Sequence, residues 1–519
     1  MRRPVRLLSL LALVAAYLPA AEAMANPFPV TSTASFGSGS LRSAIDQANA
    51  HAGPDTIPIE VTGTIGLETE LPAIADDLSI QGPGAGVLTV SRDSSAPSFR
   101  ILTGNSEAEL SIFDLTVRGG RASSGAGIRA SGPLSLTRMV VTENEAVASG
   151  GTQAVASGGG VSASDPLQLH EVTISNNEAI ATGGSIQTVA QSGGLSAGDA
   201  TLIDRSTISG NEVEAVSTGT QVVAQNGGAA VFGKPSVIER STISGNSATA
   251  ADGASQTVAS GGGLAGSDGL TLSGVTVIGN SVSSTDTASR ANLSIFGTSL
   301  VRNTIVAAPQ GAPSCSSPIA SGGFNIDADG SCGFTESSDR SGIDPGLDPV
   351  LRDNGGPTPT HALFENSIAI DRGNSFGATT DQRGLPRPSN FPAISDKEGG
   401  DGSDIGAFEL QAPLPVPGGG SPILVTAVQT ERNAPNTRIV SGPPRSTFKR
   451  LAKFRFASTE PQSHFQCKLD KKKWKACSNP FKRSVKPGKH LFRVRAIDRF
   501  GNVDPTPARF GWRVKPIAG

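Results

Sequence analysis

One short segment recurs along the middle of the chain with a nearly constant spacing. The copies read LTRMVVTENEA, LHEVTISNNEA, IDRSTISGNEV, IERSTISGNSA and LSGVTVIGNSV. Their aligned asparagines recur every 33 to 35 residues, at Asn144, Asn177, Asn211, Asn246 and Asn280. A second column keeps the same period, at Gln153, Gln187, Gln221 and Gln256. Two columns with one period indicate stacked, equivalent structural units.

The content of each unit predicts strands rather than helices. Apolar residues alternate, as at Leu270 and Leu272, and pairs of glycines separate the short runs. Thr, Ser, Val and Ile dominate these runs, whereas a helical pair needs longer stretches with a period of about 3.6 residues. Only 4% of the residues are aromatic and 17% are charged, which fits stacked strands and tight turns. We therefore predict an all-β parallel solenoid.

The asparagine column is expected to be structural. In a parallel solenoid each strand pairs with its counterpart one coil away, about 4.8 Å along the axis. Inward apolar residues then form a continuous core, and identical amides stack at the turns. Asn at a bend tolerates the left-handed conformation and bonds to nearby backbone, so we interpret this column as a structural ladder.

The two ends of the repeat region carry different patterns. Before the first strands, a short amphipathic helix is expected as a lid, from the spacing of Leu41, Ala44, Ile45 and Ala48. Here GSLRSAI resembles the N-terminal motif of CSLREA-domain proteins, which usually read CSLREAI. Ser40 stands where that family has Cys, so any role of the thiol is not carried over.

The other end, residues 348–410, contains DPVLRDNGGPTPTHALFENSIAIDRGN, TDQRGLPRP and DIGAFEL. This run is similar to the terminal segment of bacterial choice-of-anchor Q proteins. Together the two resemblances cover residues 36–410, and they imply a secreted or surface-attached right-handed parallel β-helix of the polymorphic outer-membrane-protein kind. We interpret the polar residues of these motifs as cap hydrogen bonds and ion pairs first, and as a site second; they are His361, Asp371, Asp381, Arg383, Asp404 and Glu409.

The N-terminus predicts export. Residues 1–25 combine three arginines, an apolar run that is too short to span a bilayer and a small-residue cleavage site, which is the pattern of a signal peptide. No membrane segment is expected after its cleavage, and the mature protein is expected to be secreted or associated with the cell surface. In an oxidising compartment, close cysteine pairs predict the disulfides Cys315 with Cys332 and Cys467 with Cys477.

The C-terminal part changes in composition. A Pro- and Gly-rich linker is expected at 411–436, followed at 437–516 by a small antiparallel sandwich that resembles the immunoglobulin-like modules of exported bacterial proteins. From residue 436 onward there are 21 Lys and Arg against four acids, a balance of +17, while the preceding part has a balance of −19. This asymmetry predicts an anionic cell-envelope polymer as partner, and nucleic acid is not expected. The residues predicted to bind it lie on the stapled hairpin and are Lys471, Lys472, Lys473, Trp474 and Lys475.

Parallel β-helices often carry polysaccharide lyases and hydrolases, so catalytic candidates were sought in the columns of the repeat. Seven residues before each ladder asparagine stand Thr137, His170, Asp204, Glu239 and Ser273, and six residues before stand Arg138, Glu171, Arg205, Arg240 and Gly274. Asp204 and Glu239 on adjacent coils are expected near the carboxyl spacing of a retaining glycosidase. The arginine beside each of these carboxylates favours a solvated, charged corner instead of an active site. The weak catalytic candidates are His170, Asp204, Arg205, Glu239 and Arg240.

A metal site receives little support. NIDADGSC places Asp327 and Asp329 close together but lacks the later ligands of an EF-hand, so an ordinary turn beside a disulfide is expected. No cofactor is expected, and the oligomeric state is left open. The function predicted from the sequence is an adhesion or display surface held at the envelope by the basic module, and the alternative is a polysaccharide lyase or glycoside hydrolase that acts on a long glycan.

Overall fold

In this computed structural model the described residues are 27–252, 255–315, 318–412, 435–448, 450–459, 463–497 and 503–515. The predicted signal peptide and nearly all of the predicted linker lie outside them. The chain divides into two compact units, residues 1–412 and 413–519, which are described separately.

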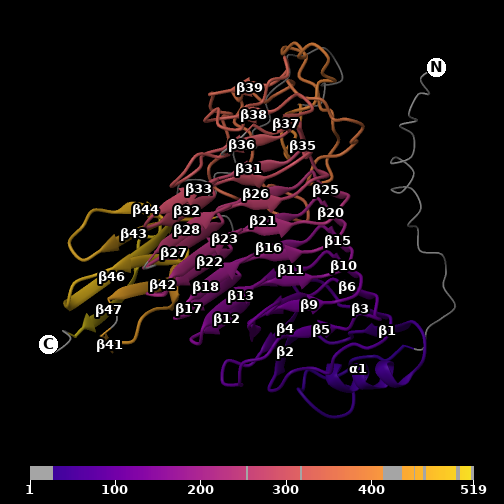
Figure 1. Ribbon diagram of the computed structural model, residues 1–519, viewed down its shortest axis with the longest axis vertical. Helices are drawn as coiled ribbons and strands as arrows, with labels where there is room; N and C mark the ends of the chain where they lie inside the picture. Colours follow the sequence, from indigo (N-terminus) through magenta and orange to yellow (C-terminus); the bar gives the residue numbers. More distant parts are fainter. Residues whose placement is uncertain are drawn as a thin grey trace. The chain divides into compact units, whose positions relative to one another are not determined.

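The first unit is a parallel β-helix whose strands stack coil upon coil, from β1 and β2 to β38 and β39 (Figure 1). Three sheets enclose one continuous apolar core. In order along each coil, they are called the first, second and third core sheets. All pairings between their strands are parallel and in register; for example, Leu134 pairs with Leu167 and Leu136 with Leu169. This confirms the fold class predicted from alternation and period.

The strands of the core sheets have the following bounds. The first core sheet contains β1 (Asp55–Pro58), β3 (Leu78–Gln81), β6 (Leu110–Phe113), β10 (Leu134–Thr137), β15 (Leu167–His170), β20 (Thr201–Asp204), β25 (Ser236–Glu239), β30 (Leu270–Ser273), β35 (Leu300–Arg302) and β37 (Ala320–Ser321). The second contains β2 (Gly63–Leu67), β4 (Leu88–Arg92), β7 (Thr116–Arg118), β11 (Val140–Thr142), β16 (Thr173–Ser175), β21 (Thr207–Ser209), β26 (Thr242–Ser244), β31 (Thr276–Ile278), β36 (Ile305–Ala307), β38 (Ile326–Asp327) and β39 (Arg340–Ser341). The third contains β5 (Leu102–Gly104), β9 (Ile128–Ala130), β14 (Val161–Ala163), β19 (Leu195–Ala197), β24 (Ala229–Val231), β29 (Leu264–Gly266) and β34 (Leu293–Ile295).

Between the second and third core sheets the middle coils extend into a two-layered wing, which the sequence did not predict. The first wing sheet contains β8 (Arg121–Ala122), β12 (Glu145–Ser149), β17 (Glu178–Thr182), β22 (Glu212–Val216), β27 (Ser247–Ala251) and β32 (Ser281–Ser284). The second wing sheet contains β13 (Gln153–Ser157), β18 (Gln187–Gln191), β23 (Gln221–Gln225), β28 (Gln256–Ser260) and β33 (Thr287–Ser289). A separate core made almost entirely of Ala and Val fills the space between them, because small side chains allow the two layers to approach closely.

The asparagine ladder lies buried where the wing joins the core. Asn177 Nδ2 donates to Asn211 Oδ1 at 2.9 Å and to the Val141 carbonyl at 3.0 Å, and the same pattern repeats along the column. A Cβ at Gly194 would come within 2.8 Å of the Asn211 amide carbon, which explains the glycine pairs of the repeat. The predicted ladder is confirmed. The left-handed residue at each of these turns is the one before the asparagine, at Glu143, Asn176, Gly210, Gly245 and Gly279.

The N-terminal end carries the predicted helix. Helix α1 (Leu41–Ala50) buries Leu41, Ala44, Ile45 and Ala48 and lies at the end of the stack beside β1 (Figure 1). Ser40 is its N-cap and accepts a hydrogen bond from the Ser43 amide at 3.2 Å, so this serine satisfies a backbone donor in the first turn of the helix. The folded unit begins before residue 36, since Pro27 and Val30 already pair with Thr56 and Ile59.

The second unit is an antiparallel β-sandwich, as predicted. One sheet contains β40 (Thr437–Ser441), β42 (Leu451–Ser458) and β45 (Phe481–Ser484). The other contains β41 (Ser446–Thr447), β47 (Ala508–Val514), β46 (Gly488–Ile497), β43 (His464–Leu469) and β44 (Lys475–Cys477), with β41 parallel to β47. Phe454 stacks on Phe492 with ring centroids 4.1 Å apart, and Trp512 packs against Phe454 from the side. Aromatic burial therefore stabilises this small unit.

Candidate binding surfaces

The predicted charged columns lie on one corner of the solenoid, between the first and second core sheets. Register pairs Thr137 with His170, His170 with Asp204 and Asp204 with Glu239, so the column is in register as expected. The next residue of each coil has a positive φ and makes the turn into the second core sheet; these residues are Arg138, Glu171, Arg205, Arg240 and Gly274. We call this set of side chains the charged corner. At this corner, one left-handed residue in each coil therefore sets the direction of the charged side chains.

The charged corner neutralises itself from coil to coil. His170 Nδ1 lies 3.0 Å from Asp204 Oδ2, and Arg240 lies 2.8 Å from Asp204 and 3.1 Å from Glu239. Arg205 pairs with Glu171 at 2.8 Å. A glycosidase pair needs an open space between its two carboxyl groups for the sugar. Here the Arg240 guanidinium occupies that space.

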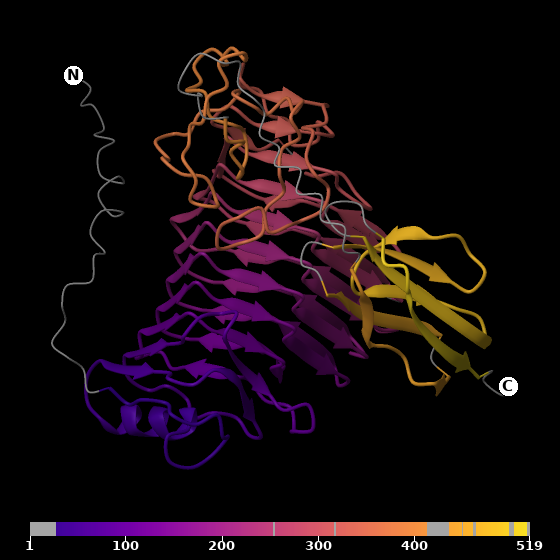
Figure 2. The same ribbon diagram turned by 180° about the vertical axis from the view of Figure 1, so that it is seen from behind.

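The C-terminal segment, residues 343–412, covers much of this corner and the outer face of the second core sheet (Figure 2). Thr207 donates to the Pro359 carbonyl at 2.6 Å, Thr242 to Gln382 at 2.6 Å, and Arg240 to Thr380 at 3.0 Å. The segment was expected at the end of the solenoid as a cap. It packs on the last coils, where Leu347 and Phe408 share a core with Ile305 and Ile326. It also extends along the strands of earlier coils, whose Thr hydroxyls supply regularly spaced hydrogen-bonding groups.

The motif residues of this segment hold it in place. His361 lies 2.8 Å from the Ser244 hydroxyl through Nε2 and 2.7 Å from the Asp348 carbonyl through Nδ1, and burial lowers its pKa. Asp381 pairs with Arg383 at 2.8 Å and accepts from the Glu409 amide. These contacts agree with the interpretation of the motif residues as cap hydrogen bonds and ion pairs.

Three buried carboxylates of the segment lie close together. Glu409 pairs with Arg387 at 2.7 Å and accepts from the Asp404 amide at 3.0 Å, while Asp404 accepts from the Asp371 amide at 2.9 Å. Burial raises the pKa of Asp371 to about 6. Burial, reinforced by the charge of Glu409, raises the pKa of Asp404 to about 8, and burial also raises that of Glu409. The segment therefore contains acids that burial keeps protonated above their usual range.

Asp327 and Asp329 serve the loop closed by Cys315 and Cys332. Asp327 accepts from the Cys332 amide at 2.7 Å, and Asp329 accepts from the Ser314 amide at 2.8 Å. Burial raises the pKa of Asp327 to about 6. Among the described residues, no cluster of three or more His, Cys, Asp or Glu side chains is arranged to hold a metal ion.

The outer face of the second wing sheet carries the predicted glutamine column and a second column that the sequence reading did not use. Gln187 donates to Gln221 at 2.9 Å, and Gln221 donates to Gln256 at 3.1 Å. Two positions later along each strand, strand alternation places a valine on the outer side, at Val155, Val189, Val223 and Val258. Val155 is 44% exposed, whereas Val223 is only 8% exposed. At the start of these strands lies a groove of about 630 Å³, and it is lined by Gln153, Ile186, Gln187, Thr220, Gln221, Ser255 and Gln256. All of these lining residues are uncharged.

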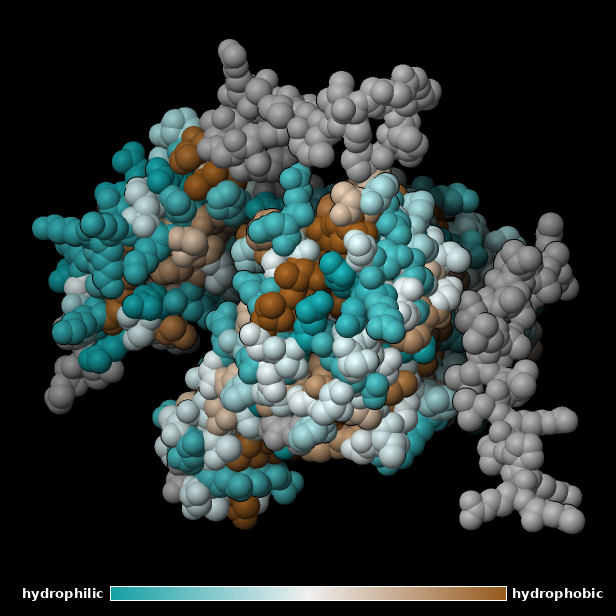
Figure 3. Space-filling model, turned by 90° about the horizontal axis from the view of Figure 1, so that it is seen from above, coloured by the Kyte–Doolittle hydropathy of each residue, from teal (hydrophilic) through white to brown (hydrophobic). Residues whose placement is uncertain are grey.

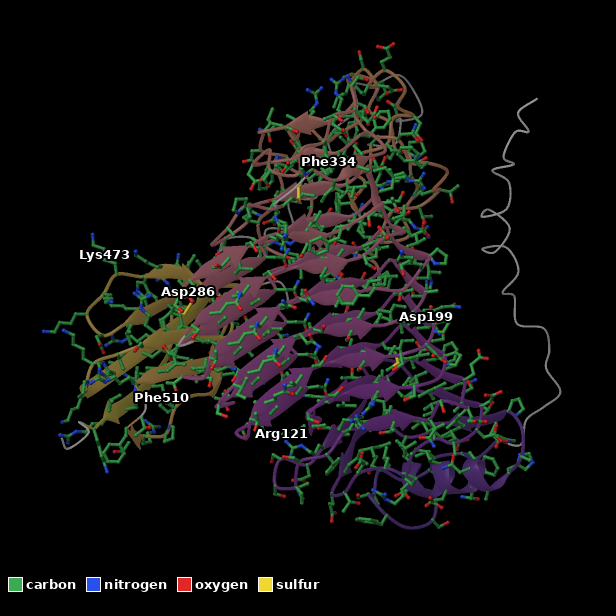
Figure 4. The ribbon with its side chains drawn as sticks, in the orientation of Figure 1. Arg121, Asp199, Asp286, Phe334, Lys473 and Phe510 are labelled. Carbon is green, nitrogen blue, oxygen red and sulfur yellow. A yellow bond between two sulfur atoms is a disulfide. The ribbon has the colours of Figure 1, made fainter. Side chains whose placement is uncertain are left out.

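The C-terminal module holds the predicted polyanion-binding residues. The disulfide Cys467–Cys477 staples β43 to β44 as predicted, and the exposed Lys471, Lys472 and Lys473 form the turn between them. Lys473 extends away from the sheets (Figure 4). The Arg495 guanidinium lies over the Trp474 ring, 4.6 Å from the ring centroid. Trp474 therefore belongs to a sheet face rather than to the lysine turn. Hydrophilic side chains dominate the module surface at the left of Figure 3.

No family model, curated protein or solved structure matches this chain. None of the helices in the described part of the chain is long and apolar enough to cross a membrane.

Proposed function

We propose that the protein is an exported adhesion or display protein, whose solenoid binds an uncharged partner through the outer face of the second wing sheet. The basic module retains it on an anionic polymer of the cell envelope. The resemblance to CSLREA-domain and choice-of-anchor Q proteins supports a place outside the cytoplasm, as do the signal-like N-terminus and the two disulfides.

The observation that carries the solenoid's role is a difference in repetition between the two faces of the wing. In the second wing sheet the middle outward position is valine in four successive coils. In the first wing sheet the equivalent column reads Val147, Ile180, Glu214 and Thr249. Core packing requires inward residues to recur, but it places no such demand on outward ones. The outward column that recurs on the first wing sheet is acidic, at Glu145, Glu178 and Glu212. Recurrence of uncharged residues on the second wing sheet alone favours a contact surface for an uncharged partner.

The chemistry of that face indicates its partner. Its strands contain no charged residue, and Val155 and Ile186 are 44% and 56% exposed. In the stacked column each amide retains hydrogen-bonding capacity toward solvent, since the ladder uses one donor and one acceptor per glutamine. An extended, uncharged and hydrogen-bonding chain, such as a neutral glycan, matches this surface.

A glycan array probed with the full-length protein tests the proposal. We expect binding to neutral glycans that is abolished by Val189→Lys, because the lysine places a charge in the valine column. Ile180→Lys is the matched control, since it adds the same charge to the outward face of the first wing sheet. Loss of binding in both variants, or in neither, would contradict the assignment.

The enzymatic alternative is tested on the same glycans by measuring their cleavage. If the protein is an adhesion or display protein, the glycans should remain intact after prolonged incubation. Cleavage that disappears in Asp204→Asn or Glu239→Gln would instead show that the charged corner is an active site.

A further inference from the structure

We infer that the module contacts its anionic partner through the outer face of the sheet formed by β41, β47, β46, β43 and β44, and that the partner is an acidic polysaccharide. This inference rests on the retention role proposed above. We call the cationic side chains of this surface the arginine face; they are Lys468, Lys489, Arg493, Arg495, Arg509 and Arg513.

Strand alternation places these side chains on one surface. In β46, Phe492, Val494 and Ala496 are buried in the core. Arg493 and Arg495 alternate with them and therefore point outward. In β47 the buried Trp512 lies between outward positions that are occupied by arginine or glycine. In β43, Lys468 lies between the buried Cys467 and Leu469.

Register then brings like charges directly opposite one another. Lys468 pairs with Arg493, and Arg493 pairs with Arg509, so three neighbouring strands carry one row of cations. A second pair, Lys489 and Arg513, lies four positions away along two of these strands, β46 and β47. Neighbouring strands are about 4.8 Å apart, and like charges in such positions destabilise a sheet. Folding alone does not favour this arrangement, but a bound polyanion stabilises it.

The described carboxylates of the module do not neutralise this row. They are Asp470, which accepts from the Leu491 amide and contacts His490 at 3.0 Å, and the buried Asp504, which accepts from the Thr437 amide. Glu460 and Asp498 lie outside the described residues. The row therefore remains cationic within the part of the module that the structure describes.

Aromatic rings around the face favour a polymer without bases. Proteins that bind single-stranded nucleic acid use free aromatic faces as stacking platforms. Here Trp474 is stacked with Arg495 at 4.6 Å and Phe448 faces Lys515 at 5.4 Å, while Phe510 packs into the core against Phe454. Cations occupy the rings, so the surface presents guanidinium groups, which match repeated carboxylates in two-point contacts.

The test compares two double variants of the full-length protein that each remove two charges. Binding to polygalacturonate is measured at rising NaCl concentration. Arg493→Gln with Arg509→Gln should weaken binding by about 10-fold or more and reduce the slope of log affinity against log salt by about two. Lys471→Gln with Lys472→Gln should change the affinity less than about two-fold, because these lysines lie on the hairpin turn. The affinity of Arg493→Lys with Arg509→Lys should lie between those of the other two double variants. Lysine keeps the positive charge but lacks the planar guanidinium that makes two-point contacts.

The outcomes separate the two levels of the proposal. A larger loss in the hairpin variant would overturn the arginine face while leaving the retention role in place. If the unmodified protein binds duplex DNA more tightly than polygalacturonate, the polysaccharide assignment is wrong. If it binds neither polymer at low salt, the retention role fails as well. Unchanged near-ultraviolet circular dichroism verifies that each variant remains folded.

Discussion

The charged corner of the solenoid and the arginine face of the module are built by the same rule with opposite results. Both place long charged side chains in register on neighbouring strands. At the corner the signs alternate, and Arg240 lies within 3.1 Å of both Asp204 and Glu239. On the arginine face Lys468, Arg493 and Arg509 share one sign. The charges of the corner compensate one another, and the C-terminal segment covers much of it. The arginine face lacks counter-charges among the described residues.

This difference separates structural charge from charge that is available to a partner. Partly buried ion pairs are costly to break singly, because the remaining partner is left uncompensated. Exposed cations contribute little to stability, and their electrostatic effect on binding depends on salt. Stability and binding measurements should therefore respond to opposite sets of substitutions.

The largest effect on stability is expected at the corner. Arg240→Gln should lower the free energy of unfolding of the solenoid by about 3 kcal/mol, because the partly buried Asp204 loses its arginine partner. Arg118→Gln, which removes the exposed partner of Glu143, should cost less than about 1 kcal/mol. Urea unfolding followed by far-ultraviolet circular dichroism measures both. Equal costs would show that the corner is no more than a surface ion-pair array.

A pH titration of stability should reveal the buried acids within the C-terminal segment. The folded pKa of Asp371 is raised to about 6, so the folded chain holds its proton where the unfolded chain, with a pKa near 3.8, has lost it. Stability should therefore fall as pH rises from about 4 to 7, by about 2 kcal/mol for this residue. Asp371→Asn should flatten this slope.

Asp401 provides a control with the opposite sign. Hydrogen bonds from Ser375 and Ser403 lower its pKa, although burial acts in the other direction. Its contribution to stability is therefore lost as pH falls through the folded pKa. Asp401→Asn should change the acidic limb of the titration and leave the decline above pH 5 in place.

Salt should act on the arginine face and hardly on the corner. Cells that display the full-length protein should release it progressively in rising NaCl, with affinity falling about tenfold or more between roughly 50 and 200 mM. A chain that ends at Leu410 should be free in the medium from the start. Equal retention of the two forms, or release that ignores salt, would exclude electrostatic attachment by the module.

The smallest effect is expected from a single arginine of the face. Arg509→Gln should change the unfolding free energy of the module by no more than about 0.5 kcal/mol, with a slight gain at low salt as repulsion is relieved. Tryptophan fluorescence reports this transition selectively, because both Trp474 and Trp512 lie in the module. A loss well above that value would mean that the side chain supports the sheet itself.

The fold was predictable because inward residues repeat with the coil. Alternation at Leu270 and Leu272 identified strands, and the spacing from Asn177 to Asn211 identified the coil length. The sequence alone did not show which residue of each coil makes the left-handed turn beside the ladder. Each ladder amide must reach the backbone inside the coil, so the preceding residue makes the turn. The column of Glu, Asn and Gly at that preceding position indicates the left-handed conformation.

The surfaces were less predictable because they depend on contacts between distant parts of the chain. Thr207 meets Pro359 across 152 residues, and no local pattern indicates that the C-terminal segment lies along earlier coils. The wing was missed because its core is mostly alanine, which gives a weak hydrophobic signal. The arginine face was visible only as alternation in HLFRVRAID, since the choice of neighbouring strands sets its rows.

The asparagine ladder gives the wing a mechanical property. Each amide is bonded both to the next amide and to the backbone of a neighbouring coil, as with Asn177, Asn211 and Val141. The ladder follows the line at which the wing emerges from the core. A pulling force at the wing tip is therefore distributed over several coils in parallel, and peeling one coil away requires breaking amide bonds to its neighbours. A surface that holds a partner under flow benefits from such load sharing.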